Sequence, residues 1–241
     1  MKICILHIGH TEPGAVSVHP PSPERFKYGL VPLLPGVEWT TVSAVLDTLP
    51  APDVCDAFLI TGGKYSVFEQ SVWQDNLFNF IRELDQNKKP LLGVCYGHQA
   101  VAHALGGKVE RSDKGWGVGL MQVAATTKTG WGPDMDEPFM LHAMHQDQVS
   151  ELPSSAVNWL ASDFCPYSGF TVGQHFWCIQ QHPDFTSDLN KDLIKKRRDR
   201  IGAERADRAI ASLENADDTQ TSIGWMARFI QRAVNGPIIE D

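Results

Sequence analysis

Residues 91–99 read Leu-Leu-Gly-Val-Cys-Tyr-Gly-His-Gln, an apolar run that ends on a cysteine between two glycines. A helix-like pattern follows over residues 100–105 and closes at Gly106-Gly107. A strand, one tight turn and a helix in this order are typical of a nucleophile elbow, which points its central side chain out of the fold. The glycines let neighbouring backbones approach closely, and the helix start favours a negatively charged sulfur. We therefore interpret Cys95 as a nucleophile; a buried structural cysteine in an ordinary turn is the alternative.

The composition limits the classes of protein that the chain can belong to. The length of 241 residues and the hydrophobic content of 42% favour one domain over residues 1–241. The net charge of -8 disfavours nucleic acid or an anionic membrane as partner. The apolar start, residues 3–8, is too short for a signal peptide or a membrane span. Five cysteines without Cys-x-x-Cys spacing argue against a disulfide framework and a zinc site. We therefore expect a cytoplasmic protein with no metal and no cofactor.

The pattern of apolar runs predicts the fold class. Buried strands are expected at residues 2–8, 39–45, 57–61 and 90–94, with helices at 25–34, 74–86 and 223–234. Beyond Gly107, residues 109–125 and 158–181 alternate and carry turn residues, as antiparallel strands do. Strands and helices that alternate at short spacing predict an α/β fold with three layers and a mainly parallel central sheet, to which a small antiparallel ribbon is added.

A base for Cys95 is expected far away in sequence, and His182 is the candidate. The strand-like residues 177–180 end at His182-Pro183-Asp184, and functional side chains of parallel sheets lie at the carboxyl ends of strands. The Asp184 carboxylate stands two residues on, where it can orient an imidazole and stabilise its charged form. A His-Pro-Asp turn without chemistry is the alternative, because proline and aspartate are common turn formers.

A second glycine pair follows the third predicted strand. Gly62-Gly63 should lie at the same edge of the sheet as Cys95, where a glycine can present a bare backbone amide. Together with the Tyr96 amide it would form a two-donor oxyanion hole. An ordinary turn between strand and helix would use the same two glycines.

These three motifs resemble those of one family. Residues 93–99 (Gly-Val-Cys-Tyr-Gly-His-Gln), 61–63 (Thr-Gly-Gly) and 182–184 (His-Pro-Asp) resemble, in order, the motifs of the class I (triad) glutamine amidotransferases. The resemblance runs from about Val37 to Phe185 and is greatest to stand-alone proteins similar to the amidotransferase domain of GMP synthetase. It implies a flavodoxin-like fold, a Cys95 thiolate that attacks the side-chain amide of glutamine, and a γ-glutamyl thioester that yields glutamate and ammonia.

The same resemblance implies roles for further residues. His182 would be the general base and acid, Asp184 its orienting carboxylate, and the backbone amides of Gly63 and Tyr96 the oxyanion hole. Gln99 matches a position that contacts the substrate. The segment His145-Gln146-Asp147 resembles the family's His-Gly-Asp segment, whose backbone helps to hold the amino-acid end of glutamine.

The sequence departs from the family pattern at three positions. Asp184 replaces the usual glutamate, and the shorter carboxylate would reach His182 by a backbone shift or through water, so we expect it to orient the base less well. Lys64 stands where the family often has proline, which leaves the preceding amide in place. Gln146 replaces a glycine, and its side chain would crowd the pocket or change what binds there.

Three functions remain open at this stage. The chain is predicted to be a glutamine amidohydrolase or amidotransferase whose ammonia acceptor lies on a separate synthetase, because no Gly-x-x-x-x-Gly-Lys-[Ser/Thr] loop is present. A γ-glutamyl peptidase that acts on peptides or conjugates is the alternative, and residues 9–35 would then help to frame its pocket. A non-catalytic module on this fold is the third. The basic run of residues 195–198 is interpreted as a solvated helix face, and binding of an anionic ligand is the alternative.

Overall fold

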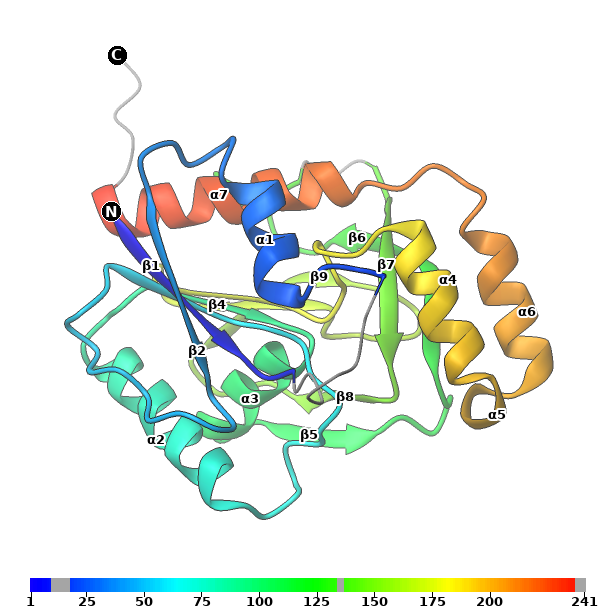
Figure 1. Ribbon diagram of the computed structural model, residues 1–241, viewed down its shortest axis with the longest axis horizontal. Coiled ribbons are helices and arrows are strands. Elements are labelled where there is room, and N and C mark those ends of the chain that lie inside the picture. Colours follow the sequence, from blue (N-terminus) through cyan, green and yellow to red (C-terminus); the bar gives the residue numbers. More distant parts are fainter. Residues whose placement is uncertain (10–17, 134–136, 237–241) are drawn as a thin grey trace.

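The computed structural model describes residues 1–9, 18–133 and 137–236, and one long mixed sheet organises them (Figure 1). Within these residues the strand order is β2-β1-β3-β4-β11-β10-β9-β6-β7. The parallel strands are β1 (Lys2–His7), β2 (Glu38–Ser43), β3 (Ala57–Ile60), β4 (Leu91–Val94) and β11 (Phe176–Ile179).

Antiparallel strands continue the parallel part of the sheet at one side. They are β6 (Gly117–Ala125), β7 (Phe139–His145), β9 (Ala156–Ala161) and β10 (Gly169–Val172). A separate two-stranded sheet pairs β5 (Lys108–Arg111) with β8 (Asp147–Glu151). The expected α/β fold is confirmed, with one difference in detail: much of the predicted ribbon belongs to the central sheet, because β10 turns back beside β11.

Helices cover both faces of the sheet, which gives the three layers. Alternate side chains of β1 point to opposite faces, so Ile3 and Ile5 enter one core while Cys4 and Leu6 enter the other. The first core packs under α1 (Ser22–Leu30) and α7 (Thr219–Asn235), and the second packs under α2 (Val72–Gln86) and α3 (Tyr96–Ala104). Figure 1 shows these two pairs of helices on opposite sides of the sheet.

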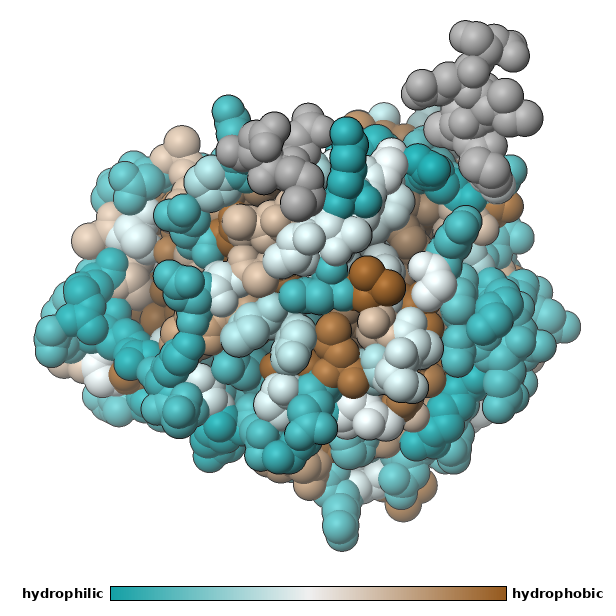
Figure 2. Space-filling view, turned by 180° about the vertical axis from the view of Figure 1, so that it is seen from behind, coloured by the Kyte–Doolittle hydropathy of each residue, from teal (hydrophilic) through white to brown (hydrophobic). Residues whose placement is uncertain are grey.

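A third apolar cluster lies against the antiparallel strands. It joins β6 and β7 to α4 (Ser187–Lys196), α5 (Arg198–Ile201) and α6 (Ala203–Ser212). On the face shown in Figure 2, hydrophilic side chains cover most of the surface, and hydrophobic atoms show mainly near the middle. No helix among the described residues has both the length and the apolar character that a bilayer span requires.

The first helix begins earlier than its sequence pattern predicted. Helix α1 spans Ser22–Leu30, whereas we expected a helix over residues 25–34. Pro23 stands in its first turn, where proline's fixed φ suits a helix and its missing N–H removes no intrahelical bond. This shift places Ser22 and Arg25 inside one rigid helix, and both side chains reach the site described next.

Candidate active site

The three predicted motifs meet at one edge of the sheet. Strands β3, β4 and β11 are parallel neighbours, and their ends are level because Ile60 pairs with Gly93 and Ile179 pairs with Val94. Gly62-Gly63 follows β3, Cys95 follows β4, and the His182 segment follows β11. The expected convergence of these motifs is therefore found in the structure.

Cys95 occupies a sharp turn between β4 and α3. Its φ of 52° lies in the left-handed region, which is rare for a residue with a Cβ, and its backbone N–H donates to the Ile179 carbonyl over 2.9 Å. The glycines on each side are required by close packing. A Cβ at Gly93 would lie 2.8 Å from the Gly97 carbonyl carbon, and one at Gly97 would lie 2.4 Å from the Ile60 carbonyl oxygen. The turn thus has the geometry expected of a nucleophile elbow.

The His182 imidazole lies beside Cys95 and Gly62. A Cβ placed on Gly62 would lie 2.7 Å from His182 Cε1 and 3.3 Å from Cys95 Cβ, so the glycine leaves the space that both side chains occupy. The ring stacks on Phe185 at 3.8 Å between centroids. Burial disfavours the imidazolium, but the charge of Cys95 and the hydrogen bond to Asp184 outweigh it and raise the pKa of His182 to about 9. The site therefore favours the imidazolium form of His182 beside Cys95.

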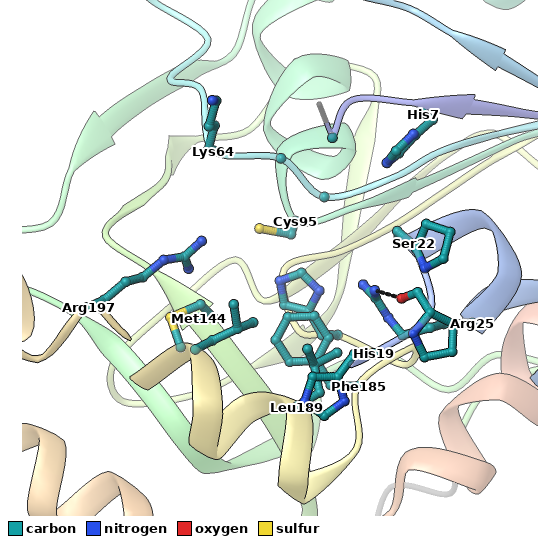
Figure 3. Close-up of a pocket in the computed structure, with 17 residues that line it drawn as sticks. His7, His19, Ser22, Arg25, Lys64, Cys95, Met144, Phe185, Leu189 and Arg197 are labelled. Atoms are coloured by element: carbon teal, nitrogen blue, oxygen red, sulfur yellow. Dashed lines mark hydrogen bonds between the residues drawn. The ribbon is translucent and has the colours of Figure 1, made fainter. Parts of the chain in front are cut away.

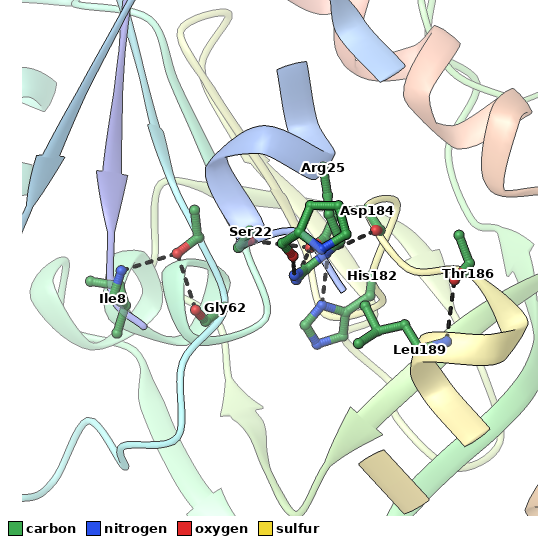
Figure 4. Close-up of polar contacts among 10 residues, drawn as sticks. Ile8, Ser22, Arg25, Gly62, His182, Asp184, Thr186 and Leu189 are labelled. Atoms are coloured by element: carbon green, nitrogen blue, oxygen red, sulfur yellow. Dashed lines mark hydrogen bonds and ion pairs between the residues drawn. The ribbon is translucent and has the colours of Figure 1, made fainter. Parts of the chain in front are cut away.

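The Asp184 carboxylate contacts His182 directly. Its Oδ1 lies 3.1 Å from His182 Nδ1, so the bridging water that we considered from sequence is not needed. The other oxygen, Oδ2, accepts from Arg25 Nη2 at 2.6 Å, from Arg25 Nε at 3.0 Å and from Ser22 Oγ at 3.1 Å (Figure 4). Burial opposes the charge, but Arg25 and His182 outweigh it and lower the pKa of Asp184 to about 2. Helix α1 therefore anchors one carboxylate oxygen and leaves the other to the imidazole.

Cys95 lines two cavities. The larger has a volume of about 630 Å³, and its walls include His182, Phe185 and the start of α1 (Figure 3). The smaller has a volume of about 80 Å³, and its walls are largely polar. The smaller cavity brings together Gly63, Cys95, Tyr96, Gln99, His145, Gln146 and Asp147. All the predicted substrate-contacting residues therefore line one space beside Cys95.

Hydrogen bonds fix the polar walls of the small cavity. Gln99 Nε2 donates to the Asp147 backbone oxygen at 2.8 Å and to Gln180 Oε1 at 2.9 Å, so both of its amide hydrogens are already used. Burial lowers the pKa of His145 to about 4 and keeps this ring neutral. The Asp147 carboxylate accepts from Ser66 Oγ and lies 3.4 Å from Arg111 Nε. These contacts pre-organise the walls before any ligand arrives.

Sequence reasoning missed two residues at this site and misplaced a third. Arg25 and Ser22 carry no motif, and the only indication was that residues 9–35 would frame a pocket. Arg197 was assigned to a solvated helix face, and this was wrong, because Arg197 is half-buried and lines both cavities. The physical reason is that α4 ends at Lys196, so the chain turns inward at the next residue. Lys195 and Lys196 are exposed, as expected.

The described part of the chain shows no group of three or more side chains suited to holding a metal ion. His142 and His145, which are spaced like a metal pair, point to other partners. His142 Nδ1 lies 3.1 Å from Asn190 Nδ2, and His145 Nδ1 lies 3.1 Å from the Asp147 backbone oxygen.

The three-layer α/β fold with a largely parallel sheet is the fold of solved class I glutamine amidotransferases. The family model for class I glutamine amidotransferases matches residues 37–198, and the chain belongs to this family. The match begins after α1, so Ser22 and Arg25 lie outside it.

The relatives include peptidases, synthases and stand-alone proteins named putative glutamine amidotransferases, such as one of Saccharomyces cerevisiae that is 30% identical over 163 residues. The chain is 34% identical over 176 residues to gamma-glutamyl peptidase 3 of Arabidopsis thaliana, a match that covers 68% of this chain and 69% of that protein. It is 29% identical over 140 residues to a GMP synthase of Dehalococcoides mccartyi, which covers 58% of this chain and 25% of the synthase. A crystal structure of a glutamine amidotransferase from Methylobacillus flagellatus superposes with a TM-score of 0.77 at 20% identity, covering 99% of this chain and 96% of that one.

Proposed function

We propose that the protein hydrolyses γ-glutamyl amide bonds through a γ-glutamyl thioester on Cys95. The thiolate attacks the γ-carbonyl carbon, and a C–S bond forms as the C–N bond breaks. His182 gives its proton to the departing nitrogen. Water then attacks the thioester while His182 takes a proton from it, so that the C–S bond breaks, the thiolate returns and glutamate leaves.

Charge and geometry support these roles for Cys95, His182 and Asp184. The imidazolium is stabilised by two neighbouring negative groups, and the carboxylate is held from its far side by Arg25. Orientation of the base by a third group is what nucleophilic catalysis requires. Free backbone amides support the proposed oxyanion hole. Among the described residues, the backbone amides of Gly63 and Tyr96 have no hydrogen-bond acceptor, so both remain available to an oxyanion.

The size of the cavity on the side of His182 supports a leaving group larger than ammonia. A protonated His182 must face the departing nitrogen, and His182 lines the large cavity but not the small one. Ammonia is about the size of water, which occupies about 30 Å³ in the liquid. A cavity of about 630 Å³ has instead the volume of a small-molecule site. We therefore favour γ-glutamyl peptides or conjugates as substrates, in line with the name of the Arabidopsis relative.

Glutamine amidohydrolysis is the second candidate, and the family match favours it. In that case a separate synthetase would cover the large cavity and receive the ammonia, as the similarity to one quarter of a GMP synthase suggests. The chemistry at Cys95 is the same in both cases, and only the leaving amine differs.

Release of glutamate from γ-glutamyl-leucine and from glutamine, measured on the purified chain, tests the proposal. We expect γ-glutamyl-leucine to have the higher kcat/KM, Cys95→Ser to abolish release, and Cys4→Ala to retain it. Cys4 is a fair control because it is a buried thiol of β1, away from both cavities. Higher kcat/KM for glutamine would favour the amidohydrolase, and no release from either substrate would favour the non-catalytic module.

A further inference from the structure

Three described cations that line the site have no acidic partner, and Arg197 is the half-buried one, whereas Lys64 and Arg200 are exposed. Its guanidinium is turned toward Cys95 in Figure 3, and the residue lines the large and the small cavity. Among the described residues it forms no side-chain hydrogen bond and no salt bridge, whereas Arg25 is committed to Asp184. A half-buried cation that no carboxylate pairs with is available to a ligand that carries negative charge.

The backbone around Arg197 fixes where its side chain begins. Its N–H donates to the carbonyls of Leu193 and Ile194, each over 3.1 Å, which closes the last turn of α4. Ile194 and Ile201 on either side are buried and anchor this corner to the protein. Burial lowers the pKa of Arg197, and the charge of Cys95 partly offsets this effect. The backbone of this corner is therefore fixed, and the guanidinium is directed toward Cys95.

Within the described residues, the large cavity has no acidic side chain in its walls to pair with Arg197. None of its lining side chains there is an aspartate or a glutamate. The wall beyond Arg197 is apolar and is formed by Met144, Phe185, Leu189 and Leu193. Such a wall suits an aliphatic or aromatic group, and the cation at its inner end suits a carboxylate.

The position of Arg197 selects one carboxylate of the substrate. In a γ-glutamyl amino acid, the α-carboxylate of the leaving residue is separated from the scissile nitrogen by a single carbon. The carboxylate of the glutamyl part is three carbons beyond the scissile carbonyl, so with the glutamyl part in the small cavity it would lie farther from the scissile nitrogen. A cation where the two cavities meet, beside Cys95, is therefore near the first of these groups.

We propose that Arg197 binds the α-carboxylate of the leaving amino acid, which makes γ-glutamyl dipeptides with an apolar second residue the preferred substrates. The inference rests on the proposed hydrolysis and specifies its substrate class. It sets such dipeptides apart from glutamine and from γ-glutamyl amines, since neither carries this carboxylate.

Two substrates that differ only in the carboxylate test the inference. They are γ-glutamyl-leucine and γ-glutamyl-leucinamide, and the measured quantity is the ratio of their kcat/KM values. We expect the wild-type chain to prefer the acid by about 10- to 100-fold, the range that a charge-assisted hydrogen bond supplies. Arg197→Gln should bring the ratio close to one by slowing hydrolysis of the acid alone, and Arg197→Lys should retain part of the preference. Lys196→Gln removes the same charge from the exposed neighbouring residue and should leave the ratio unchanged.

The outcomes separate the inference from the function on which it rests. Equal rates for acid and amide in the wild-type chain, or a ratio that Arg197→Gln leaves intact, would overturn the carboxylate site and keep the hydrolase. An equal loss on both substrates in Arg197→Gln would also overturn it, because Arg197 would then act on the thiolate or the fold. Absence of glutamate from both substrates with the wild-type chain would overturn the hydrolase and the inference together.

Discussion

Replacement of Arg25 by methionine removes the guanidinium that anchors Asp184 and keeps much of the apolar stem. The wild-type Asp184 side chain is 1% exposed, and its pKa falls from 3.8 to about 2. A shift of this size is linked to about 2 kcal/mol of stability at neutral pH. The charge of Arg25 makes the largest contribution to lowering the pKa of Asp184. We therefore expect Arg25→Met to lose a large part of that stability.

The sign of the pH dependence follows from the direction of the shift. The stabilisation by Asp184 is present above its ordinary pKa and is lost as the pH falls through about 2. Without Arg25 the carboxyl has a higher pKa in the folded protein, so this contribution is lost at a higher pH. The acid limb of kcat/KM should move in the same direction, because a protonated Asp184 no longer stabilises the imidazolium of His182.

Urea unfolding at several pH values and a pH profile of kcat/KM measure both effects. Lys27→Met is the matched control, since Lys27 lies on the same helix and pairs only with the exposed Glu24. Arg25→Lys should be intermediate, because it keeps the charge and loses the two-nitrogen contact. An Arg25→Met protein with an unshifted acid limb and wild-type kcat/KM would refute the idea that α1 positions the catalytic carboxylate.

Three further predictions concern the neighbours of the sulfur. Gly62→Ala should lower kcat/KM by about 100-fold, because the new Cβ displaces the His182 ring and a misplacement of about 1 Å has an effect of this size. Gly224→Ala on α7 is the control and should leave kcat/KM unchanged. Equal activity of the two variants would contradict the packing argument. The kcat/KM value should fall as the pH rises through about 9, where the imidazolium of His182 is lost, and a profile flat to higher pH would contradict the ion pair. A chloroketone analogue of glutamine should modify Cys95 and spare Cys178, because burial raises the pKa of the Cys178 thiol well above its usual range. Mass spectrometry of the labelled peptides identifies the modified cysteine, and a label on another cysteine would contradict the assignment.

The fold was predictable as far as it depends on local patterns. The parallel strands are short apolar runs that glycines and prolines bound, and their strand–turn–helix order is visible in the sequence. The continuation of the sheet through β10, β9, β6 and β7 was not predictable, because strand pairing joins segments far apart in the chain. Alternation of side chains indicates a strand but does not identify its neighbours.

For the site too, residues within short sequence motifs were predictable, and residues that the fold brings in from distant segments were not. Cys95 and His182 were found because each ends a strand within a short motif, and their catalytic roles remain predictions. Arg25 could not be found, because it acts on Asp184 from 159 residues away and belongs to no motif. Arg197 was misassigned because a helix end cannot be located to a single residue from sequence, and one residue separates an exposed lysine from a cavity wall.

Two cavities that share Cys95 impose an order of events on the proposed reaction. In the proposed reaction the amine would leave through the large cavity, and the attacking water would enter the space that the amine had left. Departure of the amine must therefore precede hydrolysis, which is ping-pong behaviour. A second amine that entered the large cavity before water would take the acyl group from Cys95. The ratio of hydrolysis to transpeptidation would therefore depend on what occupies the large cavity.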